Sequence, residues 1–165
     1  MSYNQDGSEW GVYGQVFDSA GLKKGSEFKV NTVTSSSQYA VHVTALSNGG
    51  FVTTWRDNSA NDAKAQIFDA VGAKVATEFT VNTYTNDTQY FSSTAAIDGG
   101  FWAVWTSNGQ DKNSWGIYAQ RFNLKGEKVG SEIAINETTN DQQHYPQIST
   151  RADGSFVITW SSQSQ

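Results

Sequence analysis

The sequence lacks cysteine, contains a single proline and carries few charges. Without cysteine, neither a disulfide nor a thiol-based zinc site or nucleophile is available. Charged residues make up only 16% of the chain, and acids outnumber bases, which gives a formal net charge of -5. Nucleic-acid binding depends on clustered Lys and Arg that neutralise phosphates. We therefore expect no nucleic-acid partner.

Long apolar runs are also missing. No stretch approaches the length that crosses a membrane as a helix, so we expect no membrane insertion. The opening residues MSYNQDG lack the basic and apolar segments of a secretory signal, and any export signal is expected outside this chain. The chain is instead rich in Gly and in uncharged polar residues, as turn-rich β domains are.

One motif occurs three times along the chain. Its first block reads YGQVFDSAGLKKGSEFKVNT, KAQIFDAVGAKVATEFTVNT and YAQRFNLKGEKVGSEIAINE, and the equivalent Gln15, Gln66 and Gln120 are 51 and 54 residues apart. A second block, of the form GGFVTTW, alternates with the first and ends in tryptophan each time. These tryptophans are Trp55, Trp105 and Trp160. Repeats of this length are typical of propeller blades rather than of helical repeats.

The two ends of the chain belong to the same cycle. Joining ITWSSQSQ, which ends at Gln165, to DGSEWGVYGQ, which begins at Asp6, reproduces the internal VWTSNGQDKNSWGIYAQ without a gap. Residues 1–165 therefore form a single repeat domain with two whole units. The first whole unit covers residues 33–82 and the second covers residues 83–136. The third, the split unit, consists of residues 137–165 together with residues 6–32.

Each unit contains four strand-like runs separated by turn signals. In the first whole unit they cover residues 39–46, 51–55, 63–68 and 78–82. We expect Gly49 and Gly50 to supply the positive φ of a primed hairpin turn. The second run is apolar on both faces, as a strand between packed layers should be. The sequence thus predicts an all-β fold, a β-propeller of four-stranded blades with three blades per chain. A β-trefoil, also threefold repetitive, is the alternative.

Three blades are too few to close a propeller, which typically has about four to eight. Two chains would supply six, with residues 147–160 of one chain completing residues 10–31 of the other. Because this leaves no open sheet edge, we expect a homodimer with twofold symmetry. The alternative is that the chain is a fragment or an engineered piece of a longer tandem array.

The strings GGFVxxW, GxYxQxFDxxG and xEFxVNTxTxxxQ resemble the tandem repeats of very large secreted bacterial proteins, of the hemolysin-type calcium-binding and adhesin-like kind. The resemblance covers essentially the whole chain. It implies an extracellular or cell-surface location in a bacterium. The first whole unit departs from the pattern, with DAKAQIF where the split unit has GVYGQVF, so we expect its loops to bind differently.

Two series of aromatic residues are the candidates for ligand binding. Trp10 and Trp115 occupy equivalent loop positions before the third strand, close to Asp6 and Asp111, where the first whole unit has Asn61. The second series follows a repeated glutamine and consists of Tyr39, Tyr90 and His144. Aromatic rings stack on sugars while polar side chains fix orientation. These residues predict a lectin-like glycan site. The alternative is that the rings pack at the edges and junctions of the units.

Four polar residues recur in every unit, and we expect them to satisfy backbone groups at turns and between units. The alternative is one ligand site per unit. The residues are Gln15, Gln66 and Gln120; Glu27, Glu78 and Glu132; Asn31, Asn82 and Asn136; and Gln38, Gln89 and Gln143.

Catalysis and metal binding find little support in the sequence. The two histidines, His42 and His144, lie in unlike contexts, and Asp98 and Asp153 sit where hairpin turns favour aspartate. Calcium prefers about six to eight oxygen ligands, but the chain has only isolated carboxylates and no DxDxDG loop. We expect no enzyme and no cofactor, and calcium is unsupported. The predicted function is a carbohydrate-binding module of a secreted or cell-surface protein. The alternative is a self-assembling repeat that closes a ring and has no ligand of its own.

Overall fold

A computed structural model of the chain describes residues 2–3 and 9–163, with all side chains among them except those of residues 2, 3, 91 and 92. Every regular element in these residues is a β-strand, and all strand pairing is antiparallel. The all-β prediction is confirmed. The same residues contain no helix of the length and apolarity needed to span a membrane.

Each whole unit forms a four-stranded sheet. The first sheet consists of β5 (Gln38–Ala45), β6 (Phe51–Asp57), β7 (Asp62–Phe68) and β8 (Phe79–Thr80). The second consists of β9 (Gln89–Ile97), β10 (Gly100–Asn108), β11 (Trp115–Asn123) and β12 (Lys128–Ala134). In both sheets the strands lie in chain order, each hydrogen-bonded to the next. Each whole unit is therefore an antiparallel meander, as the turn signals predicted.

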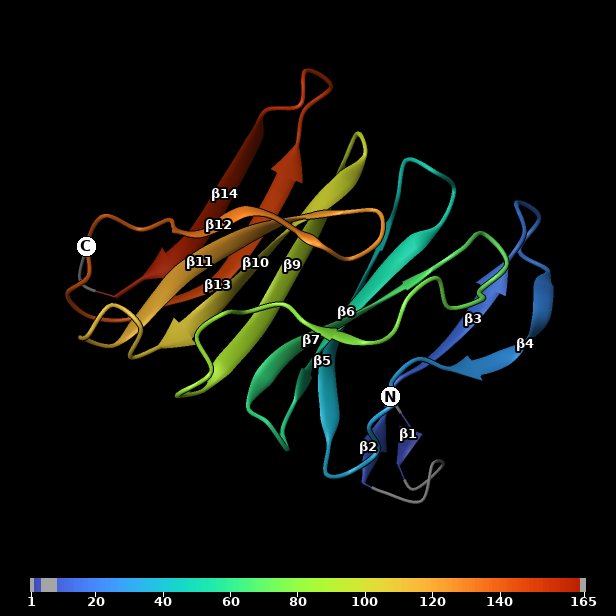
Figure 1. The fold of residues 1–165 in the computed structure, drawn as a ribbon, viewed down its shortest axis with the longest axis horizontal. Helices are drawn as coiled ribbons and strands as arrows, with labels where there is room; N and C mark the ends of the chain where they lie inside the picture. Colours follow the sequence, from blue (N-terminus) through green and yellow to red (C-terminus); the bar gives the residue numbers. More distant parts are fainter. Residues whose placement is uncertain (1, 4–8, 164–165) are drawn as a thin grey trace.

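The split unit forms two separate hairpins, β3 (Tyr13–Phe17) with β4 (Lys23–Lys29), and β13 (Gln143–Thr150) with β14 (Phe156–Ser162). A short β1 (Ser2–Tyr3) pairs with β2 (Trp10–Gly11), just before β3. Figure 1 shows the sheets in a row, with the blue β3–β4 hairpin at one end and the red β13–β14 hairpin at the other. The two halves of the split unit thus do not meet within one chain. The predicted connection from Gln165 to Asp6 lies outside the described residues.

Neighbouring sheets stack through apolar faces. Between the two whole units, Trp105 and Phe101 of β10 are fully buried in one cluster with Ala65 and Ile67 of β7. Equivalent clusters join the second whole unit to the β13–β14 hairpin and the first whole unit to the β3–β4 hairpin. Each four-stranded sheet packs one face against the preceding unit and the other against the following one, as expected of strands that are apolar on both faces.

The first strands of neighbouring units also lie beside one another. The Thr44 hydroxyl of β5 donates to the Thr94 carbonyl of β9 at 3.1 Å, and the Thr150 hydroxyl of β13 donates to the Ala96 carbonyl at 2.8 Å. These bonds connect different sheets. They place β5, β9 and β13 on the side of the row where the units come closest.

A β-bulge interrupts each first strand just after its aromatic residue. The register shifts between Tyr39 and His42 in β5 and between His144 and Gln147 in β13, and β9 shifts opposite Val104 and Trp105 of β10. The bulge residues Ala40 and Tyr145 both have φ of 56°. A bulge redirects the side chains next to it. This repeated bulge therefore sets where the Tyr39, Tyr90 and His144 rings point.

The turn between β5 and β6 differs from the predicted primed turn. Only Gly49 has a positive φ, of 83°, so the two glycines do not both adopt the left-handed region. Gly50 is needed for another reason, because a Cβ there would lie 2.3 Å from the Phe68 carbonyl oxygen of β7. Gly100 stands in the same relation to Phe122, at 2.0 Å. The second glycine allows the third strand to pass close by.

Replacing Trp105 with alanine should lower the free energy of unfolding by about 3–5 kcal/mol, because it removes a fully buried aromatic side chain from between two sheets. Urea unfolding followed by far-UV circular dichroism measures this. Tyr145→Ala is the control, since Tyr145 is 77% exposed and its loss should change stability by less than about 0.5 kcal/mol. Equal effects of the two substitutions would contradict the stacked-sheet core.

Candidate functional site

The predicted aromatic residues come together at the junctions between units. The Trp115 ring lies 5.1 Å from the Tyr90 ring and 5.3 Å from the His144 ring, measured between centroids. Tyr90 belongs to the same unit as Trp115, whereas His144 belongs to the next. Trp115 therefore sits between the first strands of two neighbouring units. Burial lowers the pKa of His144, which keeps the imidazole neutral near pH 7.

The first whole unit, which has no tryptophan here, uses an arginine instead. The Arg56 guanidinium carbon lies 4.1 Å from the centre of the Tyr90 ring and 5.2 Å from the centre of the Tyr39 ring. Its Nη2 donates to the Asn61 side chain at 3.2 Å. Cation–π contacts thus replace the aromatic contacts of Trp115. Arg56 is the site residue that the sequence prediction missed, because it comes from the end of β6 and not from the aligned loop position.

We call this series the aromatic belt. Its members run along the row of sheets in the order Trp10, Tyr39, Arg56, Tyr90, Trp115 and His144.

One end of the aromatic belt is open. Trp10 is 43% exposed and lines a hollow of about 350 Å³ with Ser37, Tyr39 and Asn58. The Tyr39 hydroxyl donates to the Asn58 side chain at 3.2 Å. Tyr39 is thus oriented at the edge of this hollow. Asp6, predicted to lie near Trp10, is outside the described residues.

Asp111 shapes the turn that leads into β11, whose first residue is Trp115. Trp10 likewise lies in β2, so the predicted loop positions of both tryptophans are wrong. The Asp111 Oδ1 accepts hydrogen bonds from the backbone amides of Asn113, at 3.1 Å, and Ser114, at 3.3 Å. Burial, together with the charges of Asp111 and Glu132, raises the pKa of Tyr118 to about 12. Asp111 therefore fixes the backbone conformation of the turn next to the aromatic belt.

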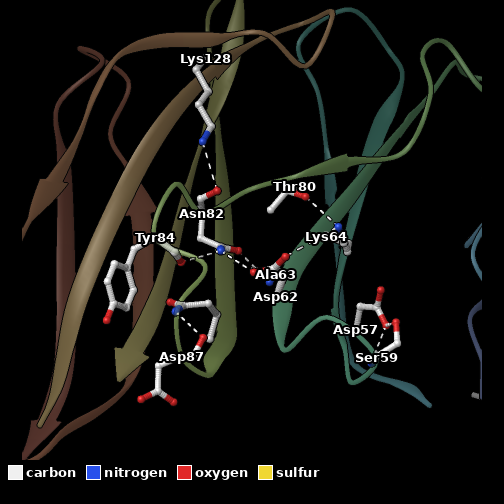
Figure 2. A network of polar contacts seen from close by, with 11 residues as sticks. Asp57, Ser59, Asp62, Ala63, Lys64, Thr80, Asn82, Tyr84, Asp87 and Lys128 are labelled. Atoms are coloured by element: carbon white, nitrogen blue, oxygen red, sulfur yellow. Dashed lines mark hydrogen bonds and ion pairs between the residues drawn. The ribbon is translucent and has the colours of Figure 1, made fainter. Parts of the chain in front are cut away.

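The repeated asparagines connect strands within a unit to the chain that leaves it. The Asn82 side chain accepts a hydrogen bond from the Ala63 amide at 2.9 Å and donates to Asp62 and to the Tyr84 carbonyl at 2.8 and 2.9 Å (Figure 2). Asn31 and Asn136 accept equivalent bonds, from the amides of Val12 just before β3 and of Ile117 in β11. The predicted structural role of these asparagines is confirmed.

The repeated glutamines are also held by backbone groups. The Gln66 side-chain amide donates to the carbonyls of Ile67 and Ala76, and Gln15 and Gln120 make equivalent bonds. Gln38 and Gln143 accept from Asn31 and Asn136 at 3.0 and 3.2 Å. In the first whole unit Asp62 takes over this role towards Asn82. The donated bonds satisfy backbone carbonyls as predicted. The Oε1 atoms of Gln66 and Gln89, however, are buried and accept no hydrogen bond from the described residues.

A third set of polar contacts joins one unit to the next. In the second whole unit, a Glu132 carboxylate oxygen accepts from the Thr83 backbone amide at 2.8 Å. Lys128 donates to the Thr83 hydroxyl at 2.7 Å and to the Asn82 carbonyl at 3.2 Å. Burial lowers the pKa of Lys128, while the Glu132 charge acts in the opposite direction. We call this Lys and Glu pair, which holds the residue after the repeated asparagine of the preceding unit, the inter-unit clamp.

The first whole unit has the same inter-unit clamp. Glu78 accepts from the Thr32 backbone amide at 2.6 Å, and Lys74 donates to the Thr32 hydroxyl at 3.1 Å. Thr32 belongs to the β3–β4 half of the split unit. The clamp is therefore a repeated feature of the junctions.

The residues considered for chemistry are engaged in local structure. Asp153 accepts from the amide and hydroxyl of Ser155 at 2.9 and 2.6 Å, and these hydrogen bonds lower its pKa. Asp98 lies in the separate turn between β9 and β10. His42 contacts the Thr94 hydroxyl at 3.2 Å, and burial lowers its pKa. The described part of the chain contains no group of three or more His, Asp or Glu side chains placed to hold a metal ion.

The chain matches no protein-family model and no curated protein significantly. The resemblance to bacterial repeat proteins stays a prediction drawn from its motifs.

Proposed function

We propose that the chain is a self-assembling β-propeller module, in which two copies close a ring of six blades. The observation that carries this proposal is the position of the split unit, whose two hairpins lie at opposite ends of the row (Figure 1), so that β14 and β3 lack the pairing that joins the second and third strands of each whole unit. In the described residues β14 pairs only with β13, and β3 pairs only with β4. No described sheet closes into a barrel, which favours stacked blades over a trefoil.

The two unpaired edges are complementary in register. In the whole units the second strand pairs with the third so that Thr53 lies opposite Gln66 and Ala103 lies opposite Gln120. The same alignment places Ile158 of one copy opposite Gln15 of the other. The sheet β13–β14–β3–β4 would then have the strand order of a whole unit. Pairing the edges removes the unpaired backbone groups that make an exposed strand prone to aggregation.

The exposed apolar side chains lie where this pairing would cover them. Phe17 at the end of β3 is 54% exposed, whereas its equivalents Phe68 and Phe122 are 1% and 0% exposed. Val157 in β14 is 45% exposed, whereas the equivalent Val52 is fully buried. Burial of apolar surface is the main favourable contribution to most protein–protein association. The two hairpins of the split unit thus expose apolar side chains that a complete four-stranded sheet and its neighbours bury.

The face of the first whole unit is also uncovered where a second copy would pack. Val43 of β5 is 62% exposed, although the equivalent Thr94 and Ile148 are 5% and 8% exposed. An apolar hollow of about 290 Å³ lies beside it and is lined in part by Val16 and Phe28 of the β3–β4 hairpin. The β13–β14 hairpin of a second copy would fill this space.

Assembly would also continue the aromatic belt. Trp115 lies between Tyr90 of its own unit and His144 of the next unit. By the same repeat, Trp10 should lie between its own Tyr39 and His144 of a second copy. Trp10 is then the place where the second copy joins the belt.

One residue at the junction departs from the whole units. Ser155 occupies the position of Gly50 and Gly100, where a Cβ would collide with the third strand. The partner strand must therefore lie farther from this turn than β7 and β11 do. We expect regular pairing between copies to begin at Val157 and Val16.

Replacing Val157 with lysine should weaken self-association by at least about tenfold, because the junction would have to bury an unpaired ammonium group. Sedimentation equilibrium over a range of concentrations measures this. The control is Val129→Lys, because Val129 is 39% exposed on an outer strand of a whole unit and should stay exposed in the ring. Wild type should approach twice the 18.0 kDa chain mass. A wild type that stays monomeric, or equal loss with both lysines, would refute the proposal.

Glycan binding is a second candidate function, and the open hollow beside Trp10 favours it. An exposed indole with Tyr39, Ser37 and Asn58 around it offers a stacking surface together with hydroxyl and amide groups. Trp115 differs, since it is half-buried whereas Trp10 is exposed. The extracellular location and the adhesin-like role implied by the motifs belong to this candidate.

If the hollow binds glycans, Trp10→Ala should abolish binding on a glycan array, while Trp115→Ala should retain most of it. The array is read with both variants at the same concentration as wild type, after circular dichroism has confirmed their folding. No signal for wild type, or equal loss with both variants, would argue against the Trp10 site.

A further inference from the structure

We propose that the junction between two copies is selected by an ion pair between Lys23 of one copy and Glu137 of the other. This inference rests on the proposed function, because it concerns the junction that the split unit would form. It uses the inter-unit clamp, which the structure contains twice and the repeat would generate a third time.

The repeat alignment identifies the members of the third clamp. Lys23 is equivalent to Lys74 and Lys128, and Glu27 is equivalent to Glu78 and Glu132. These side chains should hold Glu137, which is equivalent to Thr32 and Thr83. The split unit thus has both halves of a clamp, with Lys23 and Glu27 on β4 and Glu137 in the connection from β12 to β13.

A single chain cannot close this third clamp. Lys23 and Glu27 lie on β4 at one end of the row, whereas Glu137 connects β12 to β13 at the other end (Figure 1). All three residues are exposed. In the two closed clamps, Glu78 and Glu132 are half-buried. A second copy placed as proposed would bring Glu137 to Lys23 and Glu27.

The exchange of threonine for glutamate changes the chemistry of this clamp. In the closed clamps the lysine donates to a neutral threonine hydroxyl. At the third clamp the lysine would meet a carboxylate, and a charge-assisted hydrogen bond is stronger than a neutral one. Lys23 would also separate the carboxylates of Glu27 and Glu137, which would otherwise repel each other. The lysine would therefore oppose the repulsion between two carboxylates at this junction.

This difference gives the junction specificity. β3 and β14 each have an edge with unpaired backbone groups, and such an edge can pair with strands of many different chains. Opposite charges at a junction favour the correct approach and oppose incorrect partners. Of the three clamps, only the one between copies would combine a lysine with a glutamate on the held residue. An exposed ion pair adds little affinity by itself, so charge reversal is more informative than deletion.

The test uses two charge reversals, Lys23→Glu and Glu137→Lys, and sedimentation velocity at low salt. Each variant alone should dimerise at least about tenfold more weakly than wild type, because both of its junctions would contain like charges. A one-to-one mixture of the two should dimerise within about threefold of wild type, because every junction in the mixed dimer has opposite charges again. Lys24→Glu is the matched control, since its equivalents Val75 and Val129 take no part in a clamp.

Recovery in the mixture also shows that both variants fold. If wild type dimerises but the mixture stays as weak as its components, the ion pair is refuted while the proposed assembly stands. If Lys24→Glu weakens the dimer as much as Lys23→Glu, the effect is one of overall charge and the ion pair is again refuted. A wild type that remains monomeric refutes the assembly and the ion pair together.

Discussion

A strand that is apolar on both faces needs a packed layer on each face, and an unpaired edge of that strand needs a partner strand. In the two whole units these neighbours come from the chain itself, so that Trp55 and Trp105 are fully buried and every second strand is paired on both edges. In the split unit the same strand types keep one open edge, and Val157 and Phe17 stay exposed. The proposed assembly follows from this single imbalance, because a second copy has the matching half of the blade.

The junctions between sheets combine apolar packing with polar contacts that recur in register. Hydrogen bonds between first strands, the aromatic belt and the inter-unit clamp hold neighbouring units on different parts of each junction. Buried polar groups add specificity only when their partners are in place. A closed ring would use the same three devices at every junction, with Trp10, Lys23 and Glu137 contributing where two copies meet.

The sequence predicted the units, their four strands and the position of the cut, because repeats and turn residues determine local structure directly. It did not predict Arg56 in the aromatic belt, since that contact depends on a side chain from another strand reaching into the place of a missing tryptophan. It also misjudged Gly50, which is required by the carbonyl of Phe68 and not by its own φ. Such features arise from contacts between strands, and one sequence does not reveal them.

The register of the proposed junction can be measured directly, because the chain has no cysteine of its own. Val52 lies opposite Ile67 and Trp102 lies opposite Arg121, so Val157 of one copy should lie opposite Val16 of the other. Paired strand positions are within the distance that a disulfide spans. Oxidation of the Val16→Cys, Val157→Cys double variant should give a covalent dimer of twice 18.0 kDa, whereas the shifted pair Val16→Cys with Ile158→Cys should not. A product that stays monomeric, or equal crosslinking of both pairs, would contradict the assembly.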